Sequence, residues 1–190
     1  TSTLEITVTP VDDASVLAPD SKTVAEDTVA TGNVLSNDSD VDSTLAVTSF
    51  KVAGDATTST AGATVTLAGG TLTLGANGDY TFTPNANWNG TVPQASYTTY
   101  AGSTITLNIT VTAADDAPVD GNETNTVTED VALTVADGAS GDLLNNATDA
   151  DGNSLSITGY TIAGMSGTQA VGRTVSIAGV GSLTINANGS

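Results

Sequence analysis

The acidic side chains are the residues of this sequence best suited to chemistry, and they are gathered at a few places. Asp or Glu occupies 21 of the 190 positions, whereas Lys and Arg together occupy three. Paired acids stand at Asp12 and Asp13 and again at Asp115 and Asp116. Acids at alternate positions follow each pair in a predicted loop, at Asp38, Asp40 and Asp42 and then at Asp149 and Asp151. Carboxylates spaced by one residue repel one another unless a cation lies between them.

Calcium is the cation that this set of ligands fits best. It takes about six to eight hard oxygen ligands in a flexible shell, which loop carboxylates and carbonyls supply. Magnesium, with its stricter octahedral geometry, is the second choice. Zinc and copper would find few ligands, because the chain has no His and no Cys. The alternative is a solvated acidic surface that keeps the protein soluble. That alternative does not explain why the clusters recur at matching places.

Composition excludes several classes of function. The formal net charge is −18, so the chain would be repelled by a nucleic-acid backbone and by an anionic membrane surface. Without His or Cys, no mechanism can use an imidazole or a thiol. No apolar run approaches the length of a membrane span. We therefore expect neither nucleic-acid binding nor membrane insertion.

The chain contains an internal repeat. Residues 3–9 read Thr-Leu-Glu-Ile-Thr-Val-Thr, and Thr-Leu-Asn-Ile-Thr-Val-Thr returns 103 positions later. Other segments return in the same order at similar offsets. The matching pairs are 3–9 with 106–112, 23–27 with 126–130, 37–42 with 146–151, and 71–79 with 182–190.

The phase of the repeat predicts three segments. Residues 1–13 are the last strand and linker of a preceding repeat, and residues 14–116 are a complete repeat. Residues 117–190 are a second repeat that is incomplete at its C-terminal end, because nothing there corresponds to residues 80–112. Either the chain was cut at an exposed turn or another domain is inserted at that turn. In both cases we expect self-association through the second repeat, whose open edge would pair with another chain or with residues 3–9.

The local periodicity is that of strands. Apolar and polar residues alternate strictly over residues 104–112, which predicts a strand with one face on a core. Asn77-Gly78 predicts a hairpin between two further strands, and a slip of parity between Val47 and Phe50 predicts a bulge. No segment has convincing helical spacing. The sequence therefore predicts an all-β fold built as an antiparallel sandwich.

Four motifs along the chain carry a family resemblance. They are Thr-Val-Ala-Glu-Asp-Thr at 23–28, the Asp-rich stretch at 33–42, the Tyr, Phe and Trp stretch at 78–90, and the strand that leads into Asp-Asp-Ala-Pro at 110–118. In this order they resemble the tandem cadherin-like, immunoglobulin-like β-sandwich repeats of giant bacterial RTX adhesins. The resemblance implies non-catalytic, calcium-stiffened rods, exported by type I secretion and located outside the cell on the bacterial surface. Their partners would be neighbouring repeats of the same chain.

The resemblance to cadherins also implies how the metal ligands divide. Glu26 would be the acid near the first strand, Asp115 and Asp116 the linker, and Asp149 and Asp151 the loop of the following repeat. Asp12 and Asp13 with the loop acids Asp38, Asp40 and Asp42 would form the equivalent half-site at the other end. The remaining candidates, by analogy with Glu26 and its neighbour, are Asp27, Glu129 and Asp130.

Other functions remain open at this stage. A module that binds a glycan or a protein through exposed loops fits the same fold, as does a repeat that is split by an inserted ligand-binding domain. An enzyme ranks third, because paired carboxylates can hydrolyse glycosides but a repeated linker is a poor place for a unique cleft. Trp88 could stack on a sugar ring, although a core with few aromatic residues favours it as an anchor.

Overall fold

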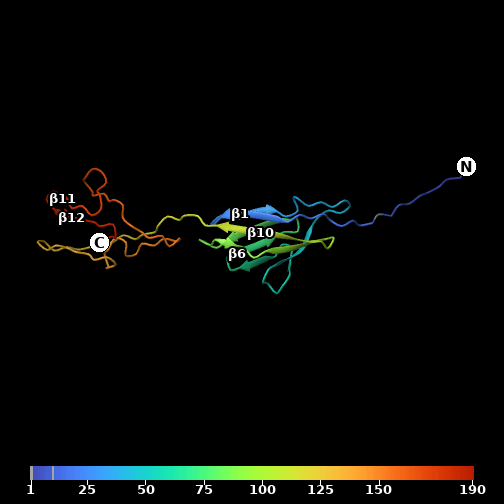
Figure 1. Ribbon diagram of the computed structural model, residues 1–190, viewed down its shortest axis with the longest axis horizontal. Helices are drawn as coiled ribbons and strands as arrows, with labels where there is room; N and C mark the ends of the chain where they lie inside the picture. The colour runs from blue at the N-terminus through green and yellow to red at the C-terminus, as the bar shows by residue number, and fades with distance from the viewer. Residues whose placement is uncertain (1, 10) are drawn as a thin grey trace. The chain divides into compact units, whose positions relative to one another are not determined.

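The computed structural model describes residues 2–9 and 11–190 and divides into two compact units (Figure 1). Unit 1 is Thr1–Ala114 and unit 2 is Asp115–Ser190. Residues 1 and 10, which belong to the segment predicted to end a preceding repeat, lie outside the described residues. The regular elements in the described part of the chain are all β-strands, and none of them is a helix. The prediction of an all-β fold is therefore confirmed.

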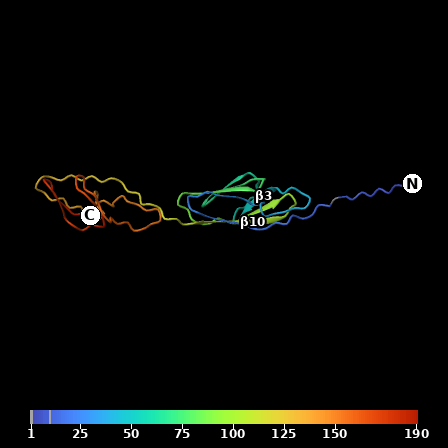
Figure 2. The same ribbon diagram turned by 90° about the horizontal axis from the view of Figure 1, so that it is seen from above.

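Unit 1 is a sandwich of two sheets. The larger sheet has the order β1-β10-β9-β3-β4, and β8 also pairs with β10. Its strands are β1 (Asp20–Ala25), β3 (Val47–Val52), β4 (Ser59–Thr60), β8 (Gly90–Thr91), β9 (Ala95–Thr99) and β10 (Thr104–Thr112). The smaller sheet has the order β2-β7-β6-β5, with β2 (Ala30–Asn33), β5 (Thr64–Leu67), β6 (Gly70–Leu74) and β7 (Asp79–Pro84). Figure 2 shows β3 and β10 of the larger sheet from above.

One pair of strands departs from the predicted antiparallel arrangement. β1 runs parallel to β10, from the pair Asp20–Leu107 to the pair Ala25–Thr112. A hairpin cannot join parallel neighbours, so the connection must be long. In unit 1 the connection between these two strands passes through both sheets.

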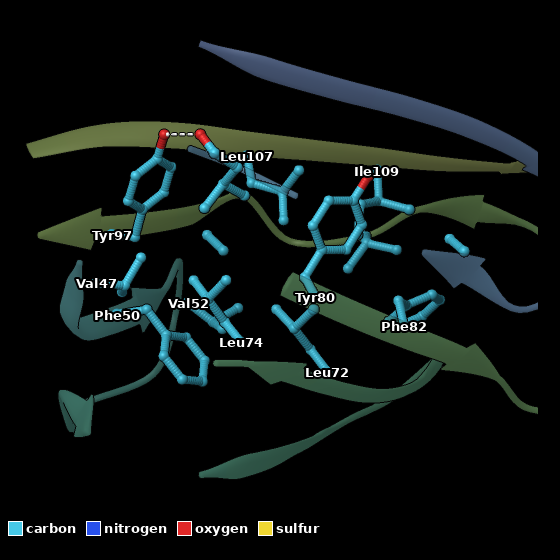
Figure 3. Packing of buried hydrophobic residues seen from close by; sticks show 14 of the residues in the cluster. Val47, Phe50, Val52, Leu72, Leu74, Tyr80, Phe82, Tyr97, Leu107 and Ile109 are labelled. Atoms are coloured by element: carbon cyan, nitrogen blue, oxygen red, sulfur yellow. Dashed lines mark hydrogen bonds between the residues drawn. The ribbon is translucent and has the colours of Figure 1, made fainter. Parts of the chain in front are cut away.

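The core lies between the sheets and follows the alternation of the strands. Leu107, Ile109 and Val111 of β10 are buried, as the strict alternation predicted. Leu107 and Ile109 face Tyr80 and Phe82 of β7, which are also buried (Figure 3). Because the polar Thr residues of β10 take the opposite face, a nine-residue strand contributes to the core while its other side stays hydrated.

The predicted turns form as expected. β6 and β7 pair through the Asn77-Gly78 turn, with Leu74 opposite Tyr80. Gly78 has φ of +85°, a backbone conformation that glycine adopts without a steric penalty. The register of β3 against β9 shifts between Val47 and Ser49, which is the predicted bulge.

Trp88 anchors a loop on the core. Its ring is partly buried against the hydrophobic cluster and meets Phe82 edge to face, with 6.1 Å between the ring centroids. A Cβ atom on Gly69 would collide with the indole, so the ring fills the space beside that glycine. Trp88 therefore packs as an anchor on the core, which was the favoured of the two interpretations of this residue.

Unit 2 has little regular structure, but it repeats contacts of unit 1. Its strands in the described residues are β11 (Val175–Ile177) and β12 (Gly181–Leu183), which form an antiparallel hairpin. The amide of Val34 donates to the Gly78 carbonyl at 2.9 Å, and Leu143 donates to Gly189 at 3.2 Å. Likewise, the hydroxyls of Thr64 and Thr73 are 2.8 Å apart, and so are those of Thr174 and Thr184. Residues that match in sequence therefore make matching bonds.

Candidate metal centre

In unit 1 the Asp-X-Asp loop is fastened to the acids that precede the sandwich. The amide of Asp13 donates to Oδ2 of Asp42 at 3.1 Å. The Ser43 hydroxyl donates to Oδ1 of Asp12 at 3.1 Å. A β-bridge between Val16 and Ser39 holds the two segments side by side, through backbone bonds of 2.8 and 3.0 Å. The linker acids and the loop acids, which are about thirty positions apart in sequence, therefore meet.

Asp40 braces the loop from within. Its Oδ1 accepts from the amides of Asp42 at 3.2 Å and Ser43 at 2.7 Å, while its Oδ2 accepts from the Ser15 hydroxyl at 2.7 Å. The Ser15 hydroxyl, followed by the Ser43 amide, lowers the pKa of Asp40 below its ordinary value of 3.8. Asp40 thus stays ionised to lower pH, as a metal ligand must.

Unit 2 builds the same arrangement from the matching residues. The amide of Asp116 donates to Oδ2 of Asp151 at 2.7 Å, and the Asn153 side chain donates to Oδ1 of Asp115 at 3.2 Å. Oδ1 of Asp149 accepts from the amides of Asp151 at 3.0 Å and Asn153 at 3.1 Å. A bridge between Val119 and Thr148 takes the place of the one in unit 1. Asp116 therefore contacts Asp151, which contacts Asp149, whereas Asp115 is bound through Asn153.

Asp38 lies apart from the other two loop acids of unit 1. Its Oδ1 accepts from the amide of Ala18 at 2.8 Å, and its Oδ2 accepts from the Tyr97 hydroxyl at 3.1 Å. In unit 2 the side chain of Asn146 accepts from the amide of Gly121 at 2.9 Å. Asn146, rather than the aligned Ala147, therefore makes the backbone contact of Asp38. This contact needs an oxygen but no charge.

Glu26 is buried at the far end of unit 1, where it receives hydrogen bonds. Its side chain is 4 % exposed. Oε1 accepts from the amide of Ala114 at 2.6 Å, and Oε2 accepts from the side chain of Asn89 at 3.3 Å. Glu26 thus holds the residue at which unit 1 ends.

The residues that follow the two glutamates are turn residues. Asp27 has φ of +57° and Asp130 has φ of +59°, in the left-handed region that Asp and Asn reach more readily than most residues. Oδ1 of Asp27 accepts from the amide of Asn87 at 3.0 Å. Glu129 is exposed. The backbone conformation gives both aspartates a structural role beside the predicted ligand role.

The donor set suits calcium, although the acids converge only in part. In the described residues no group of three or more acidic side chains is gathered closely enough to hold a metal ion. What each unit does assemble is two linker carboxylates beside a loop with two more, together with the hydroxyl oxygen of Ser43 in unit 1. These are hard oxygen ligands of the kind that calcium prefers.

Sequence reasoning missed several residues of this region. Ser15, Ser43 and Asn153 each bind a predicted ligand. Ser43 directly follows the Asp-X-Asp stretch, and this position could have identified it. No signal in the sequence identifies Ser15.

Asp20 and Tyr97 were missed as well. The Tyr97 hydroxyl lies 3.0 Å from Oδ2 of Asp20 and 2.8 Å from the carbonyl of Val34, the contact drawn in Figure 3. Burial, followed by the charges of Asp20 and Asp38, raises the pKa of Tyr97. Burial also raises the pKa of Asp20, against the hydrogen bond from Tyr97.

The fold and the acidic loops define a class of protein, a β-sandwich module with acidic loops. Residues 12–113 match the bacterial cadherin-like domain family, and because they are more than half of the 190 residues, the chain belongs to that family. Domains of this family are typically extracellular and are structural or adhesive rather than enzymatic. No curated protein matches the chain. None of its described residues form a helix able to cross a bilayer.

Proposed function

We propose that the chain is a pair of tandem, non-catalytic extender repeats from a large bacterial surface adhesin of the RTX type. Residues 14–116 would be one repeat and residues 117–190 the start of the next, after the end of a preceding repeat in residues 1–13. Each repeat would bind Ca²⁺ where its linker acids meet its Asp-X-Asp loop. The role of the repeats would be to hold a ligand-binding region away from the cell.

One observation carries this proposal. The amide-to-carboxylate bond between linker and loop occurs in both units, from Asp13 to Asp42 and from Asp116 to Asp151. A solvated acidic surface would not need the same acids in contact twice, because acids that only confer solubility gain nothing from lying close to one another. A site that is rebuilt in every repeat is what a rod needs, since each linker must resist bending.

Calcium would supply positive charge between carboxylates that otherwise repel. In unit 2 the ligands would be Asp115 and Asp116 from the linker and Asp149 and Asp151 from the loop. In unit 1 they would be Asp12, Asp13, Asp40 and Asp42. The linker acids are bound to their own unit on one side and follow Ala114 on the other, where Glu26 holds the amide. Fixing them would leave little free chain between consecutive repeats.

Thermal unfolding tests the proposal directly. An ion that binds only the folded state stabilises it by mass action, and extracellular modules bind calcium at about 10⁻⁴ to 10⁻³ M. We expect a chelator to lower the Tm and millimolar calcium to restore it, with magnesium less effective. Identical melting curves in chelator and in calcium would contradict the calcium assignment. Hydrolysis of a polysaccharide by the chain would contradict the non-catalytic role.

A further inference from the structure

In unit 1 the linker and the Asp-X-Asp loop lie antiparallel, and all their contacts keep one register. Each step forward along residues 12–18 is matched by an equal step back along residues 37–43. We call these two segments the linker–loop pair, with the acids at its outer end. From the outer end inward, the contacts join Asp12 with Ser43, Asp13 with Asp42, Ser15 with Asp40, Val16 with Ser39, and Ala18 with Asn37. The register therefore decides which acids meet.

Unit 2 keeps the same register with the matching residues. Its contacts join Asp116 with Asp151, Val119 with Thr148, and Gly121 with Asn146. Carboxylates that repel one another would not choose this arrangement by themselves. In extended segments a slip of one residue turns each side chain to the opposite face, and the acids would no longer meet. A contact that fixes the register therefore controls the candidate site.

Asp38 holds the inner end of the linker–loop pair in unit 1. It is half-buried, whereas Asp13 and Asp42 at the outer end are exposed. Its Oδ1 accepts from the amide of Ala18 at 2.8 Å, and its Oδ2 accepts from the Tyr97 hydroxyl at 3.1 Å. One carboxylate thus joins the linker segment and the loop to the core.

Tyr97 gives both segments a common fixed point. Its ring is fully buried in the core (Figure 3). Its hydroxyl lies 3.0 Å from Oδ2 of Asp20, at which β1 begins after the linker segment. The same hydroxyl lies 2.8 Å from the carbonyl of Val34, which follows β2 and leads into the loop. Both segments therefore start from one hydroxyl group, and this fixes how far along each segment the acids lie.

The alternative is that Asp38 binds the ion, as its place among the loop acids predicted. Both of its oxygens accept hydrogen bonds at the inner end of the linker–loop pair, whereas Asp42 meets Asp13 at the outer end. In unit 2 a neutral side chain, that of Asn146, makes the equivalent contact to the backbone. A position that an amide can fill needs a hydrogen-bond acceptor and not a charge.

We propose that Tyr97 and Asp38 are positioning residues for the calcium site of unit 1. The Tyr97 hydroxyl fixes the register of the linker–loop pair, and Asp38 carries that register to the loop without binding the ion. This inference rests on the proposed function, because it concerns the affinity of the site that the function requires. Replacing residues that orient metal ligands without touching the metal typically weakens metal binding by about 10- to 100-fold.

A calcium titration of the full chain, followed by NMR of the backbone amides, gives a separate Kd for each unit. The amide of Asp13 reports on unit 1, and that of Asp116 reports on unit 2 as an internal control. Tyr97→Phe removes only the hydroxyl, so the Kd of unit 1 should rise by a factor of about ten or more while that of unit 2 stays the same. Leu72→Ala, which weakens the core at a fully buried residue, should leave both Kd values unchanged.

Two replacements of Asp38 separate positioning from ion binding. In Asp38→Asn the oxygen can still accept from Ala18 and the amino group can donate to the Tyr97 oxygen, so the Kd of unit 1 should stay near that of the wild type. Asp38→Ala removes both contacts and should weaken binding as Tyr97→Phe does. Asp40→Asn neutralises a proposed ligand and should weaken binding as well. If Asp38→Asn weakens binding as much as Asp40→Asn, then Asp38 is a ligand and the proposal is wrong.

Hydrogen exchange in the calcium-free chain tests the register by itself. The amides of Val16 and Ser39 form the bridge between the two segments, and they should exchange faster in Tyr97→Phe than in the wild type. Asp38→Asn and Leu72→Ala should leave their exchange unchanged. Equal exchange in Tyr97→Phe and the wild type would overturn the proposal, as would an unchanged Kd of unit 1.

The titration also separates this proposal from the proposed function. If the wild type binds calcium and Tyr97→Phe binds it equally well, only the positioning role is wrong. If neither unit of the wild type responds to calcium, the proposed function is wrong, and the role assigned to Tyr97 and Asp38 is wrong with it.

Discussion

The backbone amide of Asp116 donates to Oδ2 of Asp151 at 2.7 Å, and the amide of Asp13 makes the same bond to Asp42 at 3.1 Å. The two bonds join residues that match in the internal repeat. Each one holds a linker acid against a second acid, which is unfavourable without a compensating cation. The pairs are therefore the first places at which to look for calcium binding.

Replacing Asp151 by Asn should reduce the stabilisation that calcium gives. The amide oxygen can still accept the bond from Asp116, but the charge that attracts the ion is gone. At ten times the Kd, calcium stabilises a single site by about 1.4 kcal/mol, and the variant should lose most of this at unit 2. Thermal unfolding with and without calcium measures the difference. Glu5→Gln, which neutralises an exposed acid far along the sequence, should respond to calcium like the wild type.

The linker acids should control flexibility. Replacing both Asp115 and Asp116 by Ala removes the linker part of the proposed site while leaving the core of unit 1 untouched. With calcium present, small-angle X-ray scattering should show a wider distribution of dimensions for this double variant than for the wild type. The melting transition of unit 1 should not change. Identical scattering from the two proteins would show that the linker acids do not limit bending.

The Tyr97 hydroxyl should matter for stability. It lies within hydrogen-bond distance of Asp20, Val34 and Asp38, and Tyr97→Phe would leave the buried carbonyl of Val34 and the two partly buried carboxylates without this donor. We expect a loss of about 1–3 kcal/mol in the free energy of unfolding, measured by urea denaturation. Tyr100→Phe is the matched control, because Tyr100 is exposed. Its unfolding free energy should be nearly that of the wild type.

The ionisation of Asp20 should affect stability in the direction opposite to that of Asp40, because the pKa of Asp20 is raised and that of Asp40 is lowered. Burial raises the pKa of Asp20 above its ordinary value of 3.8, so the folded state holds this proton more tightly than the unfolded state. The ionised form therefore opposes folding increasingly as the pH rises from 3.8 through the folded pKa. Asp20→Asn should be more stable than the wild type above this range, and the gain should shrink as the pH falls through it. A difference that does not vary with pH would contradict this origin.

Repeat-matched leucines provide a direct measure of burial. Leu107→Ala should cost about 2–5 kcal/mol, because the side chain is buried in the core and its removal leaves a cavity. Leu4→Ala, at the matching exposed position, should cost almost nothing in dilute solution. Chemical denaturation of both variants at low concentration makes the comparison. Equal losses would show that residues 3–9 are packed in solution.

Patterns within short segments predicted much of unit 1. The alternation around Leu107 specified a half-buried strand, and Asn77-Gly78 specified a hairpin, because both signals depend only on neighbouring residues. The parallel pairing of β1 with β10 could not be predicted in this way. It depends on which distant strand fills the open side of β1, and no local pattern records that.

The candidate site was predicted less completely, for a related reason. Spacing shows that Asp38, Asp40 and Asp42 are close along the chain, but it does not show which donors each one faces. Asp38 turns to Tyr97, far away in sequence, while Asp40 binds its own loop. Ser15 joins the site only because the bridge at Val16 brings it there.

The parallel pairing of β1 and β10 determines how unit 1 would respond to a pulling force. The chain enters at Asp20, at one end of the pair, and leaves at Thr112, at the other. Tension on the two ends therefore slides the strands lengthwise past each other, and all the cross-strand hydrogen bonds resist together. The amide of Glu26, bound to Thr112 at 2.8 Å, and the Glu26 carboxylate, bound to Ala114, extend this clamp to the exit. In a chain of such units under tension, the units would unfold one at a time, and each unfolding event would release the load on the others.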